Sequence, residues 1–182
     1  SRASRTNALS EIRDIAGRPV IYQGDVFAVS HSGVFSATDL RTGQARWSLP
    51  ITGITSPWPA GDVVYVVDKG GKVYCVSRDN GQVYWVRDLS EGRVKKMRGA
   101  FFSKLGKGKK GKNIVHPLWS SPILANGRLI TASDTGELVA INAKTGAVEK
   151  SVELGEPVLL APIALNGSLY VVTDEAKLIA LR

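Results

Sequence analysis

A twelve-residue pattern that recurs along the chain restricts its fold more than any other feature. The segment SATDLRTGQARW at 36–47 recurs as YCVSRDNGQVYW at 74–85 and, in a weaker form, as VAINAKTGAVEK at 139–150. A fourth copy starts with IALR at 179–182. One small residue marks the same position in each copy: Ala37, Cys75, Ala140 and Ala180, at intervals of 38, 65 and 40 residues. The sequence is therefore built from units of about 40 residues, one of which carries an insertion.

The same order of parts precedes each copy of the pattern. Each unit opens near a proline, at Pro19, Pro57, Pro122 and Pro162. A glycine-containing turn and a short apolar run follow, the runs lying at 26–29, 63–67, 129–132 and 169–172. Short β-branched runs between turns are typical of strands buried on both faces. A second tight turn leads into the repeated pattern, so each unit is predicted to form four short antiparallel strands.

This period and strand count predict an all-β fold, a β-propeller of four-stranded antiparallel blades. A single four-stranded sheet cannot bury both of its faces, so neighbouring sheets must stack. We expect one domain over residues 1–182, with blades at 17–51, 54–89, 119–154 and 158–182 and an insertion at 90–117. Four such blades amount to half of an eight-bladed ring.

The insertion carries most of the charge imbalance. The net charge is +8, but nine of the 24 Lys and Arg residues lie between 93 and 112, and the remaining 15 face 16 acidic residues. The basic loop consists of Arg93, Lys95, Lys96, Arg98, Lys104, Lys107, Lys109, Lys110 and Lys112, with Phe101 and Phe102 among them. Three interpretations remain open: a solvated excursion, a loop that binds anionic lipid headgroups or a partner, and a nucleic-acid contact. Because no recognition fold accompanies the charge, no nucleic-acid partner is expected.

The repeated pattern resembles the tryptophan-docking motif of quinoprotein-type propellers. In that family the Trp lies between adjacent blades, against small residues of its neighbour. An aromatic side chain of roughly 200 Å² seals such a seam only where small residues leave room for it. The resemblance assigns this role to Trp47, Trp85, Gly43, Gly81, Gly146, Ala37 and Ala140. Lys150 stands at the Trp position of the third copy, so we expect that seam to be weaker or sealed in another way.

Within this class the chain resembles the BamB family of outer-membrane assembly lipoproteins. The stretch at 64–68, the turn Asp39-Leu40-Arg41-Thr42-Gly43 and the terminal 178–182 are similar to the C-terminal half of that family. The resemblance implies a non-catalytic periplasmic scaffold attached to the inner leaflet of the outer membrane, with the lipid anchor outside this sequence. Its implied partners are the POTRA domains of the central barrel-insertion protein, contacted through Leu40 and Arg41, and unfolded outer-membrane proteins.

Ring closure gives a further expectation. BamB-like propellers have eight blades, and a strand from the N-terminus completes the last one. Here the fourth unit stops at Arg182, before a fourth strand. We therefore expect that strand to come from the remaining half of the propeller or from a second copy, because a bare blade edge invites aggregation.

Quinone-dependent dehydrogenases share the fold, so an enzyme fragment is the alternative, and a ligand-sensing propeller is a third possibility. The enzymes of that family use a vicinal Cys pair, calcium ligands and a stacking Trp. This chain has one cysteine, Cys75, at a packing position, and its two histidines, His31 and His116, lack metal-ligand spacing. We therefore predict no enzyme activity, no catalytic residue, no metal and no cofactor.

Overall fold

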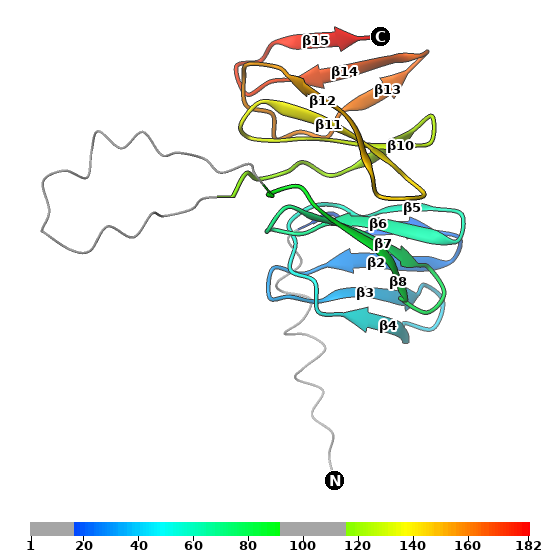
Figure 1. Cartoon of the computed structure of the whole chain (residues 1–182). Coiled ribbons are helices and arrows are strands. Elements are labelled where there is room, and N and C mark those ends of the chain that lie inside the picture. The colour runs from blue at the N-terminus through cyan, green and yellow to red at the C-terminus, as the bar shows by residue number, and fades with distance from the viewer. Residues whose placement is uncertain (1–16, 92–115) are drawn as a thin grey trace, which may run out of the picture.

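The computed structural model of the chain describes residues 17–91 and 116–182. This part contains strands and no helix (Figure 1). The first blade consists of β1 (Val20–Tyr22), β2 (Asp25–Val29), β3 (Phe35–Asp39) and β4 (Ala45–Leu49). The second consists of β5 (Trp58–Ala60), β6 (Val63–Val67), β7 (Lys72–Ser77) and β8 (Val83–Asp88). The third consists of β9 (Ile123–Ala125), β10 (Arg128–Ala132), β11 (Glu137–Asn142) and β12 (Val148–Glu153). The last consists of β13 (Ile163–Leu165), β14 (Ser168–Val172) and β15 (Leu178–Leu181).

Each sheet is an antiparallel meander in which every strand pairs with the next one along the chain. The β-propeller prediction is confirmed: the described residues form three four-stranded blades and a last blade with three strands, stacked face to face in chain order (Figure 1). The register repeats as well. A bulge separates the third and fourth strands at the same place in each complete blade, after Ala37, Cys75 and Ala140.

The turns lie on two opposite sides of the stack, as strand alternation requires. On one side, the turn between a blade's third and fourth strands hydrogen-bonds to the turn between its first and second. The N–H of Leu40 donates to the carbonyl of Gly24 over 2.8 Å, and Arg78 and Ala143 make the same bond to Asp62 and Gly127. These contacts bring two turns of each blade together on one rim of the propeller.

The hydrophobic core lies between the blades. The cluster around Phe27, Phe35, Val64 and Val76 fills the seam between the first and second blades. A second cluster, which includes Tyr65, Leu129 and Ile141, fills the next seam, and a third, around Leu138, Val158 and Val171, fills the last. Burial of both faces explains why β6 and its counterparts in the other blades consist mostly of apolar residues. Among the described residues no helix has the length and apolar character needed to span a membrane.

Candidate partner-binding turn

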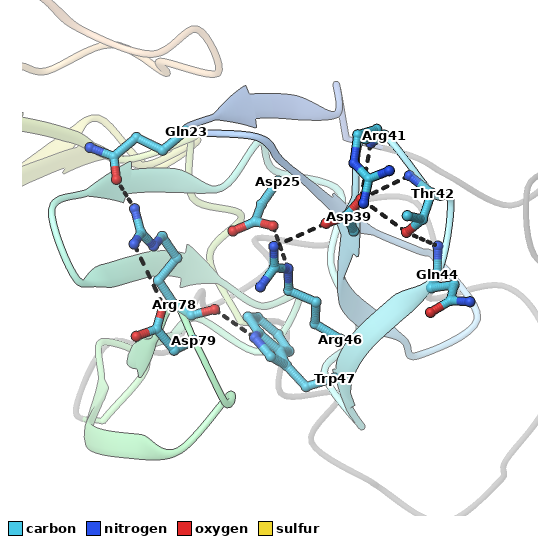
Figure 2. Close-up of polar contacts among 10 residues, drawn as sticks. All are labelled: Gln23, Asp25, Asp39, Arg41, Thr42, Gln44, Arg46, Trp47, Arg78 and Asp79. Carbon is cyan, nitrogen blue, oxygen red and sulfur yellow. Dashed lines mark hydrogen bonds and ion pairs between the residues drawn. The ribbon is translucent and has the colours of Figure 1, made fainter.

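The β3–β4 turn presents the two residues predicted to contact a partner, and its own side chains hold it in shape. The Asp39 carboxylate oxygen Oδ1 accepts the backbone N–H of Arg41 at 3.1 Å and that of Thr42 at 2.8 Å (Figure 2). The Thr42 hydroxyl donates to the same oxygen at 2.9 Å. An aspartate that accepts hydrogen bonds from the backbone N–H groups two and three residues ahead commonly stabilises such a turn. The conformation of the turn is therefore fixed before any partner arrives.

Arg46 ties this turn to the neighbouring strand. Its guanidinium contacts Asp39 at 3.1 Å and the buried Asp25 of β2 at 2.6 Å, so it lies between the two carboxylates (Figure 2). The bonds from the Thr42 backbone and hydroxyl, with smaller contributions from Arg41 and Arg46, hold the pKa of Asp39 below its usual value. Asp39 is therefore ionised at neutral pH, and it remains an acceptor for the turn.

Leu40 and Arg41 point outward from this fixed turn. The Leu40 side chain is 52% exposed, although leucine is ordinarily buried. The Arg41 side chain is also exposed, and within the described residues it makes no hydrogen bond or ion pair. An apolar side chain beside an unpaired guanidinium on a rigid turn has the composition of a small binding hot spot.

In the second blade, the Trp of the first blade packs on the equivalent turn. The indole N–H of Trp47 donates to the carbonyl of Arg78 at 2.7 Å (Figure 2). Gly81 lies under the indole ring, and a Cβ built on it would come within 2.9 Å of the ring. On its other side the ring packs against Phe27 and Phe35 of its own blade, with centroids 6.2 and 5.1 Å away.

The turn of the third blade repeats this arrangement. Trp85 donates its indole N–H to the carbonyl of Ala143 at 3.2 Å, and the Tyr65 hydroxyl donates to the same oxygen at 3.1 Å. Gly146 lies under the Trp85 ring, where a Cβ would come within 2.7 Å of it. Ala37 and Cys75 are the cross-strand neighbours of the two Trp residues, and Ala140 is that of Lys150.

Gly43 occupies the same position in the first blade but has no ring on it. Its backbone has a φ of +70°, close to the +74° of Gly81, and nothing lies within 4 Å of a Cβ built there. Gly81 is buried and Gly43 is exposed. Among the described residues, no Trp covers the acceptor turn of the first blade, the turn to which Leu40 and Arg41 belong.

The seam between the third and last blades lacks its Trp, and a cavity takes its place. Lys150 is exposed at the Trp position. A cavity of about 860 Å³ opens beside it, and its apolar lining includes Ile130, Leu138, Leu169 and Leu181. In the other two seams, Trp47 and Trp85 occupy the position of Lys150 and pack an indole ring on the next blade.

Several residues considered at the sequence level have structural roles or fall outside the described ranges. Cys75 is buried in the second seam, and burial raises the pKa of its thiol to about 11, which makes it a poor nucleophile at neutral pH. His31 is exposed, with its Nε2 at 2.9 Å from the Nζ of Lys69. The basic loop from Arg93 to Lys112 lies outside the described residues.

Sequence reasoning did not predict two polar features of this site. The Arg46 bridge joins Asp25 and Asp39, and the indole acceptors are backbone carbonyls 31 and 58 residues away from their donors. The recurrence of a Trp and a glycine-containing turn was the only available signal for the second feature, because a carbonyl acceptor leaves no trace in residue identity.

Together, the stacked meanders, the seam clusters and the indole-on-glycine contacts define a class: this chain is a β-propeller segment of the quinoprotein repeat type. A family model described as "Outer membrane protein assembly factor BamB" matches residues 1–87 and 98–182. The chain therefore belongs to the BamB family of outer-membrane protein assembly factors.

Individual relatives agree with this assignment. The BamB of Escherichia coli K12 is 26% identical over 146 residues, an alignment that covers 80% of this chain and 31% of the relative. The chain thus spans about a third of the length of the curated relatives it matches. The crystal structure of BamB from Moraxella catarrhalis matches 92% of this chain with a TM-score of 0.70 at 15% identity, and the match covers 43% of that chain.

A redox enzyme shares the fold. Quinohemoprotein alcohol dehydrogenase from Comamonas testosteroni matches 95% of this chain with a TM-score of 0.64 at 16% identity, over 33% of its own length. A likeness at this level of identity shows the propeller fold alone.

Proposed function

We propose that this chain is part of a non-catalytic periplasmic scaffold at the outer membrane that serves the assembly of β-barrel proteins, and that its β3–β4 turn binds the POTRA region of the central barrel-insertion protein. Family membership supports the general role, because the relatives are outer-membrane assembly factors. The turn supports the specific contact: Arg41 supplies an exposed charge and Leu40 an apolar surface, and Asp39 holds the backbone of the turn that carries both.

The observation that carries the proposal is the exposed guanidinium of Arg41, which has no partner among the described residues, on a turn whose backbone Asp39 already holds. A preorganised backbone turn loses little conformational entropy on binding, and arginine is a common hot-spot residue. The residues at the same turn position in the second and third blades, Asp79 and Lys144, are also exposed. The position is thus available to a partner whether or not a neighbouring blade covers the rest of the turn.

The non-catalytic part of the proposal rests on what the candidate reactive groups do in the fold. Cys75 packs in a seam with its thiol protonated, and Trp47 and Trp85 are fixed between blades by bonds to backbone carbonyls. These side chains serve the packing of the propeller.

A binding experiment tests the turn. The POTRA region is immobilised, and the dissociation constants of the 182-residue chain and its Arg41→Glu variant are measured by biolayer interferometry. A charge-assisted hydrogen bond contributes about 1.5–3 kcal/mol, so the variant should bind roughly 10- to 100-fold more weakly. The matched control is Lys144→Glu, which makes the same charge change at the equivalent turn of the third blade.

The two variants together decide the outcome. The proposal expects Lys144→Glu to bind like the unmodified chain. Unchanged binding by Arg41→Glu, or an equal loss in both variants, contradicts a specific role of this turn, because an equal loss reports net charge alone. A double substitution of Leu40 and Arg41 by Ala that binds normally contradicts it as well.

A second candidate function, the binding of unfolded barrel clients, is favoured by β8. This strand forms the outer edge of the second blade within the described residues, and its Val83, Tyr84 and Val86 are exposed. The outer strands β4 and β12 are mostly polar at the matching positions, where Val86 is replaced by Ser48 and Ser151. An exposed apolar edge accepts an extended peptide by strand addition.

Fluorescence anisotropy with a labelled, extended peptide of alternating apolar residues tests this second function. Val86→Lys should weaken binding, because lysine on an edge strand opposes strand addition, whereas Ser48→Lys at the equivalent position of β4 should not. A peptide N-methylated on its pairing amides should fail to bind. Equal binding of the methylated peptide would show that strand pairing plays no part.

A further inference from the structure

A cluster of three charged residues lies behind the β3–β4 turn. We call it the first-blade triad, and it consists of Asp25 at the start of β2, Asp39 at the end of β3 and Arg46 in β4. Asp25 and Asp39 are cross-strand partners, and the Arg46 guanidinium lies between their carboxylates (Figure 2). Arg46 has no cross-strand partner, because it is the extra residue of the bulge beside Trp47. The triad therefore connects the carboxylate that holds the turn to Asp25, which is buried on an inner strand.

The third blade carries the same cluster with its charges exchanged. The register places three residues at the positions of the first-blade triad, and we call them the third-blade triad: Arg128, Asn142 and Glu149. Glu149 pairs with Arg128 and accepts a hydrogen bond from the side-chain amide of Asn142 at 2.8 Å. The Asn142 oxygen Oδ1 accepts the backbone N–H groups of Lys144 at 3.0 Å and Thr145 at 3.1 Å. The bonds from Asn142 and Arg128 hold the pKa of Glu149 below its usual value, so the pair is charged at neutral pH.

The second blade does without such a triad. Its three matching positions hold uncharged residues, Val63, Ser77 and Tyr84. Trp47 nevertheless packs on the turn of this blade and bonds to the Arg78 carbonyl, so the docking of a neighbour's Trp does not require a triad. The two turns with a triad behind them present a basic side chain, Arg41 or Lys144. The turn without one presents Asp79. The triad thus accompanies the basic residue of the turn and not the Trp seam.

We propose that Asp25 and Arg46 are positioning residues of the partner-binding turn: they act through Asp39, which holds the backbone that presents Arg41. This inference rests on the proposed function of that turn. Two triads of opposite charge order make the same backbone bonds in two blades, so the turn requires pairing within the triad and not an arginine at one position. A turn released from its triad has to be ordered when a partner binds, and this lowers the affinity.

Breaking each triad in turn tests the proposal. Arg46→Glu places a third carboxylate beside Asp25 and Asp39, and it should weaken binding to the immobilised POTRA region roughly three- to tenfold, the effect of ordering a released turn. The matched control is Glu149→Arg, which breaks the third-blade triad in the same way and should leave the affinity unchanged. Both variants should lower the urea midpoint. An equal loss of affinity in both would show that they act through general stability, which overturns the positioning role.

Rebuilding the third-blade triad in the first blade gives the decisive result. The triple variant Asp25→Arg/Asp39→Asn/Arg46→Glu keeps the damaging glutamate but restores the pairing and an acceptor for the turn. Its affinity should return to within about twofold of that of the unmodified chain. A triple variant that is folded by circular dichroism but binds as weakly as Arg46→Glu would show that Arg46 contacts the partner itself, which overturns the proposal. Further weakening of the Leu40→Ala/Arg41→Ala variant by Arg46→Glu would overturn it too, because a positioning residue acts only through the side chains it positions.

Amide hydrogen exchange followed by NMR separates this inference from the proposed function, because it needs no partner. Arg46→Glu should speed the exchange of the Arg41 and Thr42 N–H groups, and the triple variant should restore their protection. Unchanged exchange in Arg46→Glu would overturn the positioning role. If exchange responds in this way but Leu40→Ala/Arg41→Ala binds the POTRA region normally, the triad positions the turn and the POTRA contact is refuted.

Discussion

The indole-on-glycine contact makes a quantitative prediction, because the chain holds its own control. Gly81 and Gly43 occupy the same turn position with φ values of +74° and +70°. A Cβ on Gly81 would meet the Trp47 ring at 2.9 Å, and a Cβ on Gly43 would meet nothing within 4 Å. Substituting each glycine by alanine therefore separates the backbone cost from the cost of the lost seam contact.

The backbone cost is common to both variants. An L-residue in the left-handed region costs about 1–2 kcal/mol, and this is the whole expected effect of Gly43→Ala. Gly81→Ala adds the overpacking of the seam, about 1–3 kcal/mol, since the indole cannot shift without losing its 2.7 Å bond to Arg78. The expected loss of unfolding free energy is thus about 2–5 kcal/mol for Gly81→Ala.

Urea unfolding followed by circular dichroism measures both losses at one protein concentration, and a constant m-value shows that the midpoints report stability. The double variant Trp47→Ala/Gly81→Ala completes the test. When Trp47→Ala has removed the indole, the loss of unfolding free energy caused by Gly81→Ala should fall to that caused by Gly43→Ala. Equal destabilisation by the two glycine variants in the presence of Trp47 would refute the seam argument.

Three further predictions follow from the other seams and from the turn. Lys150→Trp should fill part of the cavity in the third seam and stabilise the chain by about 1–3 kcal/mol, seen as a higher Tm; a lower Tm would show that this seam cannot admit a ring. The Cys75 thiol should react with a disulfide reagent at pH 8 only when the chain unfolds, and rapid labelling of the native protein would contradict this. The free energy of unfolding should fall as the pH rises from 9 to about 11, because in that range the thiol is ionised in the unfolded chain but still protonated in the folded chain. The Asp39 carboxylate stabilises the folded turn above its ordinary pKa of 3.8, and this contribution should be lost as the pH falls below that value, so Asp39→Asn should remove that part of the acid sensitivity measured by urea titration.

The propeller can be predicted from the sequence because each blade is specified by short local signals that recur at a regular spacing. Glycine turns, β-branched runs and the spacing of Ala37, Cys75 and Ala140 recur in every unit, and each determines structure within a few residues. The four-strand meander also places the Gly24 and Leu40 turns on one rim, where a 2.8 Å bond joins them.

Contacts between side chains that are far apart along the chain are harder to predict from the sequence. The Arg46 bridge depends on which face of β2 turns Asp25 toward β4, and the indole acceptors are carbonyls that any residue could supply. From Lys150, the third seam was expected to be weaker or sealed in another way. The cavity itself was not predicted, because its size depends on how far Leu138 and Leu169 close around it. The assignment of the basic loop and of Leu40 and Arg41 remains a prediction.

The acceptor turn explains how one structural element can serve both seam and partner. In the second and third blades, the residue after the third strand gives its carbonyl to the neighbouring Trp, and the next side chain, Asp79 or Lys144, remains in solvent. By the same geometry, the Leu40 carbonyl has the position of the Trp acceptor, and Arg41 has the position of the side chain that stays in solvent. Arg41→Glu should therefore weaken POTRA binding and leave the urea midpoint of the chain unchanged. A midpoint lowered as far as by Gly81→Ala would mean that Arg41 stabilises the fold and that this assignment is wrong.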